Sequence, residues 1–391
     1  MDFALEPQYE LLRETAKRIA KEKVLPRARE IDQTGEYPQD LFEVFKKAGF
    51  LGLCIPEEFG GSGAGIFGLT LAIEQVAKYS NAAALMLLLT RLPTGPIMIG
   101  GNNDQKKRYL PGIADGTMRA AFGLSEPQAG SDVVGMRTKA ESDPKSEGGY
   151  ILNGLKCWMS GVKQANYYVV FAKVGDSNKR DHRLIKAFIV RRELSGVSIG
   201  RIDSKMGVKG VDTGELVLEN VRVEKHDVLE GMEGFKLAML SLNSMRPIVA
   251  ARGIGLAEGA LMYATEYLCS REGFGGHMID FQGLQWEIAK LATEIEAARL
   301  LTYRAAKLSD RGCFDKPYVP FLSMAKYYAT EVSVKASGLA LQLLGAAGYM
   351  TDHLTELYYR DAKQLTIVEG TSQVQLGLIA KGVIQKDLWW D

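Results

Sequence analysis

The sequence is poor in the residues that build disulfide frameworks and metal sites. Its 391 residues include only four cysteines and four histidines. The cysteines are far apart and form no CxxC pair, so we expect four buried, reduced thiols rather than a disulfide framework or a zinc site. The histidines lack the spacing of metal ligands, and no metal site is predicted.

An excess of charge of one sign and a long hydrophobic run are also lacking. Lys plus Arg number 48 against 47 for Asp plus Glu, a net charge of +1, whereas a nucleic-acid-binding protein would concentrate basic residues on one face. The longest apolar stretch, from Ala82 to Leu89, is too short to span a bilayer. The N-terminal segment resembles no signal or transit peptide. We therefore expect a cytoplasmic protein that binds neither nucleic acid nor membrane.

Hydrophobic residues make up 46% of the chain, enough for a large core. Up to about residue 120 the pattern is helical, since Leu12, Ala16 and Ile19 recur with the period of an amphipathic helix. Pro26 and Pro38 divide this region into separate helices. A further helical run is predicted over residues 67–89.

The character of the sequence changes after about residue 120. Short β-branched and aromatic runs, separated by turn residues, predict strands at 167–172, 184–190, 215–218 and 221–223. From Gly234 onward the helical period returns, and Leu284, Ile288 and Leu291 belong to one long apolar stripe typical of a helical bundle. The expected fold is α+β, mainly α, with an N-terminal helical domain (1–120), a middle antiparallel β-domain (121–232) and a C-terminal helical bundle (233–391).

One motif is misleading. Gly63 to Gly68 matches GxGxxG, but a dinucleotide site needs this motif between a strand and a helix. Here a turn containing proline precedes it and helical patterns surround it. The glycines are therefore predicted to form a turn.

Four stretches carry more information. They are Phe122–Asp132 (FGLSEPQAGSD), Asn153–Ser160 (NGLKCWMS), Arg271–Gly275 (REGFG) with Gln282, and a C-terminal set of Leu341–Gly345, Gly348-Tyr349, Arg360-Asp361 and Val368–Gln373 (VEGTSQ). Each alone has an ordinary structural interpretation, such as a surface turn or a solvated helix position. Together, in this order and over nearly the whole chain, they resemble the flavin-binding and catalytic signatures of the acyl-CoA dehydrogenase family.

The resemblance implies FAD bound between the β-domain and the C-terminal bundle. Ser125 and Ser160 stand where family members usually have threonine, and the hydroxyl is retained. Arg271, Phe274 and Gln282 would hold the FAD pyrophosphate and adenosine across a subunit interface, where the planar fork of an arginine suits phosphate. The full set of implied FAD contacts is Phe122, Leu124, Ser125, Trp158, Ser160, Arg271, Phe274, Gln282, Gln342, Gly345, Thr371 and Gln373.

Glu369 is the predicted catalytic base. Oxidation of an acyl thioester removes a weakly acidic α-proton, so a base and stabilisation of enolate charge are needed. Gly370 lets the backbone approach a ligand closely, and the apolar neighbours of Glu369 would raise its pKa. Some family members carry the base on the residue that corresponds to Met245, which cannot accept a proton. The resemblance also places Ser131 and Arg246 along the path of coenzyme A and the thioester.

Two positions bear on the acyl group. Val368 is smaller than the residue that many family members have there, which predicts extra room beside the reacting carbons. Arg91 lies in a very apolar run, and a buried arginine needs an anionic partner. Arg91 either pairs with a protein carboxylate or reaches solvent, or else it binds a second carboxylate of a substrate such as a benzylsuccinyl-CoA type.

Other functions remain open from the sequence. The alternatives are an ordinary short- or medium-chain fatty acyl-CoA dehydrogenase, an acyl-CoA oxidase or flavin monooxygenase on the same fold, and a non-catalytic helical scaffold. Flavin monooxygenases of this fold typically lack the catalytic glutamate. The resemblance further implies an electron-transfer flavoprotein as electron acceptor and a homo-oligomer, commonly a tetramer.

Overall fold

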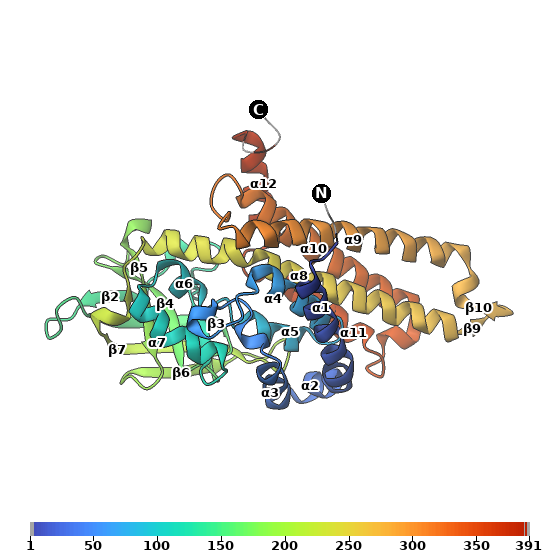
Figure 1. Ribbon diagram of the computed structural model, residues 1–391, viewed down its shortest axis with the longest axis horizontal. Coiled ribbons are helices and arrows are strands. Elements are labelled where there is room, and N and C mark those ends of the chain that lie inside the picture. The colour runs from blue at the N-terminus through green and yellow to red at the C-terminus, as the bar shows by residue number, and fades with distance from the viewer. Residues whose placement is uncertain (1–3, 387, 389–391) are drawn as a thin grey trace.

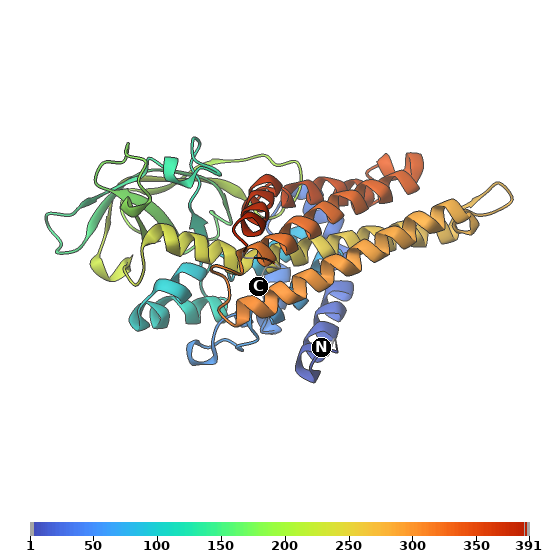
Figure 2. The same cartoon turned by 90° about the horizontal axis from the view of Figure 1, so that it is seen from above.

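The computed structural model describes residues 4–386 and residue 388, and it divides into three regions along the chain (Figure 1). An N-terminal group of helices is followed by a β-domain and then by long helices that run the length of the molecule (Figure 2). The N-terminal helices are α1 (Pro7–Ile19), α2 (Ala28–Thr34), α3 (Gln39–Lys47), α4 (Gly65–Ala77), α5 (Asn81–Leu88), α6 (Gly95–Gly100) and α7 (Asn103–Ala114). The order of helices, one β-domain and then helices confirms the predicted fold class.

The helical run predicted over residues 67–89 is two helices, α4 and α5. Ser80 separates them, because its backbone is extended and its hydroxyl accepts a hydrogen bond from the backbone N–H of Ala83. Such an N-cap starts a new helix wherever the preceding one has ended. Apolar residues alone did not predict the break, since both helices are buried on nearly all sides.

The glycine motif at residues 63–68 forms a turn that enters α4, as expected. Gly63 and Gly65 both have positive φ angles. The backbone N–H groups of Ile66 and Phe67 at the start of α4 donate to the carboxylate of Asp310. A protein side chain therefore occupies the place where a nucleotide phosphate would bind.

The middle region is a single eight-stranded sheet. Its strands are β1 (Ala120–Gly123), β2 (Lys139–Ser142), β3 (Tyr150–Ser160), β4 (Tyr167–Val174), β5 (Ile185–Arg191), β6 (Val197–Ile202), β7 (Thr213–Val223) and β8 (Val228–Leu229). The order is β6-β7-β3-β2-β4-β5-β8, with β1 beside β4. The predicted antiparallel domain is a mixed sheet, because β4 pairs in parallel with β1 and β2. Strand pairing of this kind depends on distant segments and leaves no local pattern.

The C-terminal helices are α8 (Gly234–Ser270), α9 (Gln282–Asp310), α10 (Val319–Leu343), α11 (Thr355–Leu365) and α12 (Ser372–Ile384). A small hairpin, β9 (Glu272–Gly273) and β10 (Gly276–His277), joins α8 to α9 at the end of the molecule farthest from the β-domain (Figure 1). Helix α8 carries a continuous buried surface from Met245 to Ala257. This helix connects the region beside the sheet to the bundle.

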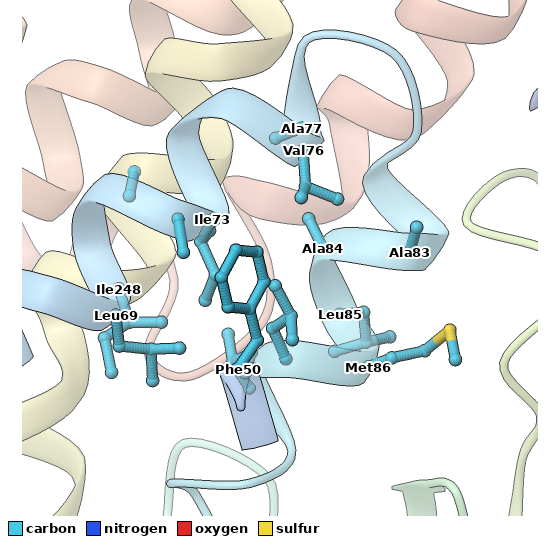
Figure 3. Close-up of a cluster of buried hydrophobic side chains, with 14 of the residues drawn as sticks. Phe50, Leu69, Ile73, Val76, Ala77, Ala83, Ala84, Leu85, Met86 and Ile248 are labelled. Carbon is cyan, nitrogen blue, oxygen red and sulfur yellow. The ribbon is translucent and has the colours of Figure 1, made fainter. Parts of the chain in front are cut away.

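The core near the centre joins the N-terminal helices to α8. Leu69, Ile73 and Val76 of α4 pack with Leu85 of α5, and Ile248 of α8 belongs to the same cluster (Figure 3). All five side chains are at most 3% exposed. This core sets the distance and angle between α5 and α8, two helices that also line the candidate site.

The expectation of four buried thiols is half wrong. Cys54 and Cys157 are buried, but Cys269 is exposed and Cys313 is partly exposed; all four are free thiols. The described residues contain no group of acidic, histidine and cysteine side chains able to hold a metal ion. Within the same residues no helix is long and apolar enough to cross a membrane.

Candidate active site

A cavity of about 1140 Å³ lies where the β-domain, α5, α8 and the segment before α12 meet. Single ligand pockets are typically about 300–1,000 Å³ in volume, so this cavity is larger than most of them. One wall comes from the sheet and the loop after β1, and the opposite wall comes from α8 and the segment between α11 and α12. Of the residues predicted from the sequence, eleven line it: Phe122, Leu124, Ser125, Ser131, Trp158, Ser160, Arg246, Val368, Glu369, Gly370 and Thr371.

Glu369 lies in the short connection between α11 and α12. Its φ angle is 55° and that of Gly370 is 95°, so two successive residues adopt left-handed backbone conformations. A non-glycine residue in this region carries conformational strain, which is often found at functional sites. The turn directs Glu369 toward the cavity rather than along either helix.

Glu369 is partly exposed as a residue, but one of its carboxylate oxygens is buried. Its Oε2 has no hydrogen-bond partner among the described residues. Burial raises the pKa of Glu369 to about 7, although the positive charges of Arg252 and Lys326 act in the opposite direction. A carboxylate with a pKa near neutrality is well matched to accept a proton from carbon.

Two side chains fix the turn next to Glu369. The buried Lys326 of α10 donates from Nζ to the carbonyl oxygen of Gly370 over 2.8 Å, and Gln375 Nε2 donates to the same oxygen over 3.1 Å. Thr371 caps the start of α12 by accepting from the backbone N–H of Val374. A Cβ atom on Gly370 would lie 2.5 Å from Gln375 Nε2, so glycine is required there by both space and φ.

The wall opposite Glu369 is anchored by a buried ion pair. Lys156 of β3 contacts Glu126 over 2.6 Å, and the two side chains are 0% and 2% exposed. Lys156 also donates to the carbonyl oxygen of Leu124, while Glu126 accepts from the backbone N–H groups of Arg137 and Thr138. The loop that carries Leu124 and Ser125 is thereby fixed to the strand that carries Trp158 and Ser160.

Trp158 is presented by an irregularity in β3. The register between β3 and β7 shifts between Lys156 and Met159, and Trp158 has a φ angle of 54°. Its side chain is 54% exposed and lines the cavity. Its position on the cavity wall allows the FAD contact that the resemblance implies.

These residues fit a flavin. Hydroxyl groups of Ser125, Ser160 and Thr371 line the cavity together with the open face of Trp158. Thr213 Oγ1 and Arg246 Nε also line it and are buried without hydrogen-bond partners among the described residues. Buried polar atoms of this kind are normally satisfied by a ligand or by water.

The other seven predicted residues do not line this cavity. Arg271, Phe274 and Gln282 lie at or beside the β9–β10 hairpin, at the far end of the molecule from the β-domain (Figure 1), and the side chain of Phe274 is 93% exposed. Gln342, Gly345 and Gln373 are also exposed. None of these six residues lines the cavity within one chain, although Gln373 lies at the start of α12 between Thr371 and Val374, which do.

Arg91 is buried but also absent from the cavity wall. Its Nη2 donates to Ser244 over 3.1 Å, and its Nη1 is buried without a partner and packs against Gly95. No carboxylate of the described residues lies within 4.0 Å of the Arg91 guanidinium, and the side chain is buried. Arg91 therefore neither forms an ion pair with these residues nor reaches solvent. Burial lowers the pKa of Arg91.

Sequence reasoning missed four positions of this site. Lys326 and Arg252 lie on long helices whose pattern predicts only buried faces, and the pairing of Lys156 with Glu126 joins segments thirty residues apart. A charged residue within an apolar helical stripe was the available signal for Lys326 and Arg252. No signal in the sequence specified their partners.

The chain matches three family models in succession: the acyl-CoA dehydrogenase N-terminal domain over residues 6–117, the middle domain over 121–221 and the C-terminal domain over 232–384. It is 39% identical over 388 residues to an acryloyl-CoA reductase (NADH) of Anaerotignum propionicum, covering 99% of this chain and 97% of the relative.

Solved structures agree with the sequence relatives. A chain solved in work on the electron transferring flavoprotein of Acidaminococcus fermentans is 38% identical, with a TM-score of 0.93, covering 98% of this chain and 100% of that one. A glutaryl-coenzyme A dehydrogenase in complex with glutaryl-CoA is 34% identical, with a TM-score of 0.92, covering 98% and 97%. The chain belongs to the acyl-CoA dehydrogenase family of FAD-dependent oxidoreductases.

Proposed function

We propose that Glu369 removes the α-proton of a coenzyme A thioester, which the chain oxidises to its 2,3-enoyl form. The observation that carries this proposal is that Glu369 lines a large cavity while its Oε2 is buried without a hydrogen-bond partner among the described residues. A general base must lie within reach of its proton and must be unprotonated at working pH. Glu369 has a pKa of about 7, so a large fraction is ionised at neutral pH.

FAD, when bound, supplies the acceptor for the hydride that leaves the β-carbon. Ser125, Trp158, Ser160 and Thr371 would hold it from the walls on which they lie. The protein then has three tasks: to orient the thioester, to exclude water, and to hold the α-proton on Glu369. Lys326 contributes to positioning the base, because it fixes the carbonyl of Gly370 in the turn that carries Glu369.

The acyl group is proposed to be bulky or dicarboxylic, of the benzylsuccinyl-CoA type. Val368 supports the first property, because it lines the cavity next to Glu369 with a small side chain. Arg91 and Arg252, which are buried without a carboxylate partner among the described residues, support a dicarboxylic acyl group. An ordinary fatty acyl-CoA is the alternative, and an oxidase would differ in its electron acceptor.

We also propose an electron-transfer flavoprotein as acceptor and a homo-oligomer, by analogy with the family, as the functional unit. Arg271, Phe274 and Gln282, which lie away from the cavity, would reach the cofactor of a partner subunit. Large apolar side chains are exposed in the C-terminal region, including Phe274 in the β9–β10 hairpin, Trp286 and Leu300 on α9, and Tyr349 between α10 and α11. An exposed apolar surface of this kind is typical of an interface between subunits.

The test is a Glu369→Gln variant loaded with FAD and mixed anaerobically with acyl-CoA thioesters while flavin absorbance is followed. We expect the rate of flavin reduction to fall by about 10²–10⁴, the usual contribution of a general base. Glu141→Gln, an exposed position on β2, is the matched control and should reduce flavin normally. Unchanged reduction in Glu369→Gln would refute the assignment.

A further inference from the structure

Arg252 is a buried arginine that lines the cavity, as Arg246 does and Arg91 does not. Its side chain is 1% exposed, and it projects from the middle of α8. Nε donates to Asn81 Oδ1 over 2.7 Å and Nη2 donates to Gln364 Oε1 over 2.9 Å. Nη1 has no hydrogen bond to any residue that the structure describes.

The charge of Arg252 is not neutralised locally. Both acceptors are neutral amides, and no carboxylate of the described residues lies within 4.0 Å of the guanidinium. Burial lowers the pKa of Arg252 to about 10, with Glu369 and Asp361 acting against this shift. A buried charge held only by amides is costly unless an anion joins it in the functional state.

The partners of Arg252 show where it lies in the cavity. Asn81 starts α5, and Leu85 and Leu89 follow it at intervals of four residues, so the three share one face of this helix segment. Leu85 and Leu89 line the cavity and Asn81 does not. Arg252 is thus held at the end of an apolar wall suited to hydrocarbon.

Gln364, the second hydrogen-bond partner of Arg252, lies near the turn that contains Glu369. Gln364 precedes Val368 by four residues, and the backbone N–H of Val368 donates to the carbonyl of Gln364 over 3.0 Å. Gln364, Val368 and Glu369 all line the cavity. A thioester with its α-carbon at Glu369 and its acyl group along Leu85 and Leu89 would direct the distal end of that group toward Arg252.

We propose that Arg252 binds a carboxylate at the distal end of the acyl group, so that the substrates are monothioesters of dicarboxylic acids. This inference rests on the proposed function and identifies the Arg252 guanidinium as the group that selects the substrate. A carboxylate would accept two hydrogen bonds, one from an N–H group of Nη1 and one from an N–H group of Nη2, as is common for arginine–carboxylate pairs. The second carboxylate takes no part in bond making and is retained: the proton leaves Cα for Glu369, and FAD, when bound, would accept the hydride from Cβ.

Arg91 does not fill this role, although the sequence suggested it. Its guanidinium is held between Ser244 and Gly95, behind the surface that the cavity exposes. Arg91 and Arg252 are therefore a matched pair of buried arginines, one away from the cavity and one on its wall. Substitutions at the two positions distinguish anion binding in the cavity from a general effect of removing a buried charge.

The experiment measures binding by calorimetry in FAD-loaded Glu369→Gln protein, which binds without turnover. Glutaryl-, adipyl- and benzylsuccinyl-CoA are compared with uncharged acyl thioesters of the same lengths. We expect Arg252→Gln to weaken binding of the dicarboxylic thioesters by about 10–100-fold, the effect of losing hydrogen bonds between charged groups, and to change the uncharged thioesters little. Arg252→Lys keeps the charge and should retain part of the preference, and Arg91→Gln should retain all of it.

Three outcomes would overturn the proposal. Arg252→Gln could weaken both classes of thioester equally, which would make Arg252 a structural residue. Arg91→Gln could abolish the preference instead, which would return the role to Arg91. Wild-type protein could oxidise acyl-CoA thioesters with no preference for a second carboxylate, which would leave the proposed role of Glu369 intact but remove the dicarboxylic substrate class. If no thioester reduces the flavin of the wild type, the proposed function itself fails.

Discussion

At the scale of single residues, the site depends on how charges are placed around one carboxylate. Burial of the Glu369 carboxylate favours its neutral form, while Lys326 and Arg252 favour its ionised form. The balance leaves its pKa at about 7. A base acts only when ionised, so activity should be low below this pH and high above it.

This balance predicts that the pH profile of Lys326→Met differs from that of the wild type. The rate of flavin reduction in the wild type should rise with pH through a midpoint near 7. Loss of the Lys326 charge raises the pKa of Glu369, so the midpoint should move to higher pH. If the midpoint rises by about one pH unit, the rate at neutral pH should be roughly fivefold lower, because less of the carboxylate is ionised there. Stopped-flow reduction across pH is the measurement.

The control is Lys335→Met, on the same helix but exposed and paired with Glu294. It should leave the midpoint where the wild type has it. A Lys326→Met variant that is slower at every pH, with an unmoved midpoint, would show that Lys326 only holds the Gly370 carbonyl in place.

At the scale of secondary-structure elements, the buried pair of Lys156 and Glu126 joins β3 to the loop after β1. Neither side chain is accessible to water, and each makes further hydrogen bonds to backbone groups. Breaking such a pair leaves an uncompensated buried charge. The loop and the strand carry Ser125 and Trp158, so the pair also sets the shape of the wall opposite Glu369.

Lys156→Met should therefore destabilise the protein by about 3–5 kcal/mol, the usual effect of removing one member of a buried ion pair. Urea unfolding followed by circular dichroism measures this loss, and flavin absorbance after desalting reports weaker retention of FAD. The double variant Lys156→Met with Glu126→Gln should recover part of the stability because no charge is left unpaired. Equal stability of the single and double variants would contradict this account.

At the scale of the whole molecule, the residues that the family resemblance assigns to FAD do not all lie together in one chain (Figure 1). One group lines the cavity, whereas Arg271, Phe274 and Gln282 lie at or beside the β9–β10 hairpin, away from it. A single chain cannot bring them to one ligand. An assembly in which the hairpin of one subunit reaches the cavity of another would unite them.

Phe274→Asp tests this arrangement. Phe274 is 93% exposed and contacts Phe281 edge to face, so the substitution should change the folding of one chain by less than about 0.5 kcal/mol, as is usual at the surface. In the assembly it would place a charge in an interface, and we expect smaller oligomers and loss of FAD on dilution. Light scattering and the absorbance ratio of flavin to protein are the measurements.

Leu11→Asp, another exposed apolar position, on α1 and at 71% exposure, serves as the control. It should keep both the assembly size and the flavin content. A Phe274→Asp protein that assembles and retains FAD as the wild type does would exclude the hairpin from the cofactor site.

Much of the fold was predictable because local sequence patterns determine its helices and strands. The period of apolar residues distinguishes helix from strand, and β4, which is buried on both faces, shows the continuous apolar run YYVVFA. The break between α4 and α5 was missed because both helices are apolar nearly all round and the cap at Ser80 is a single hydrogen bond. The parallel pairings of β4 were missed because pairing partners are chosen by contacts between distant segments.

The order of residues along the chain was enough to indicate the family, the FAD cofactor and Glu369 as the candidate base, because the motifs that specify them are short and occur in a fixed order. Which side chains share the cavity depended on the packing of the folded chain. Arg91 and Arg252 are both arginines in apolar helical regions, and nothing in their neighbours along the chain separates them. The packing of α5 and α11 against α8 places Arg252 on the wall and Arg91 behind it, since the direction of a side chain on a helix has meaning only relative to the helices around it.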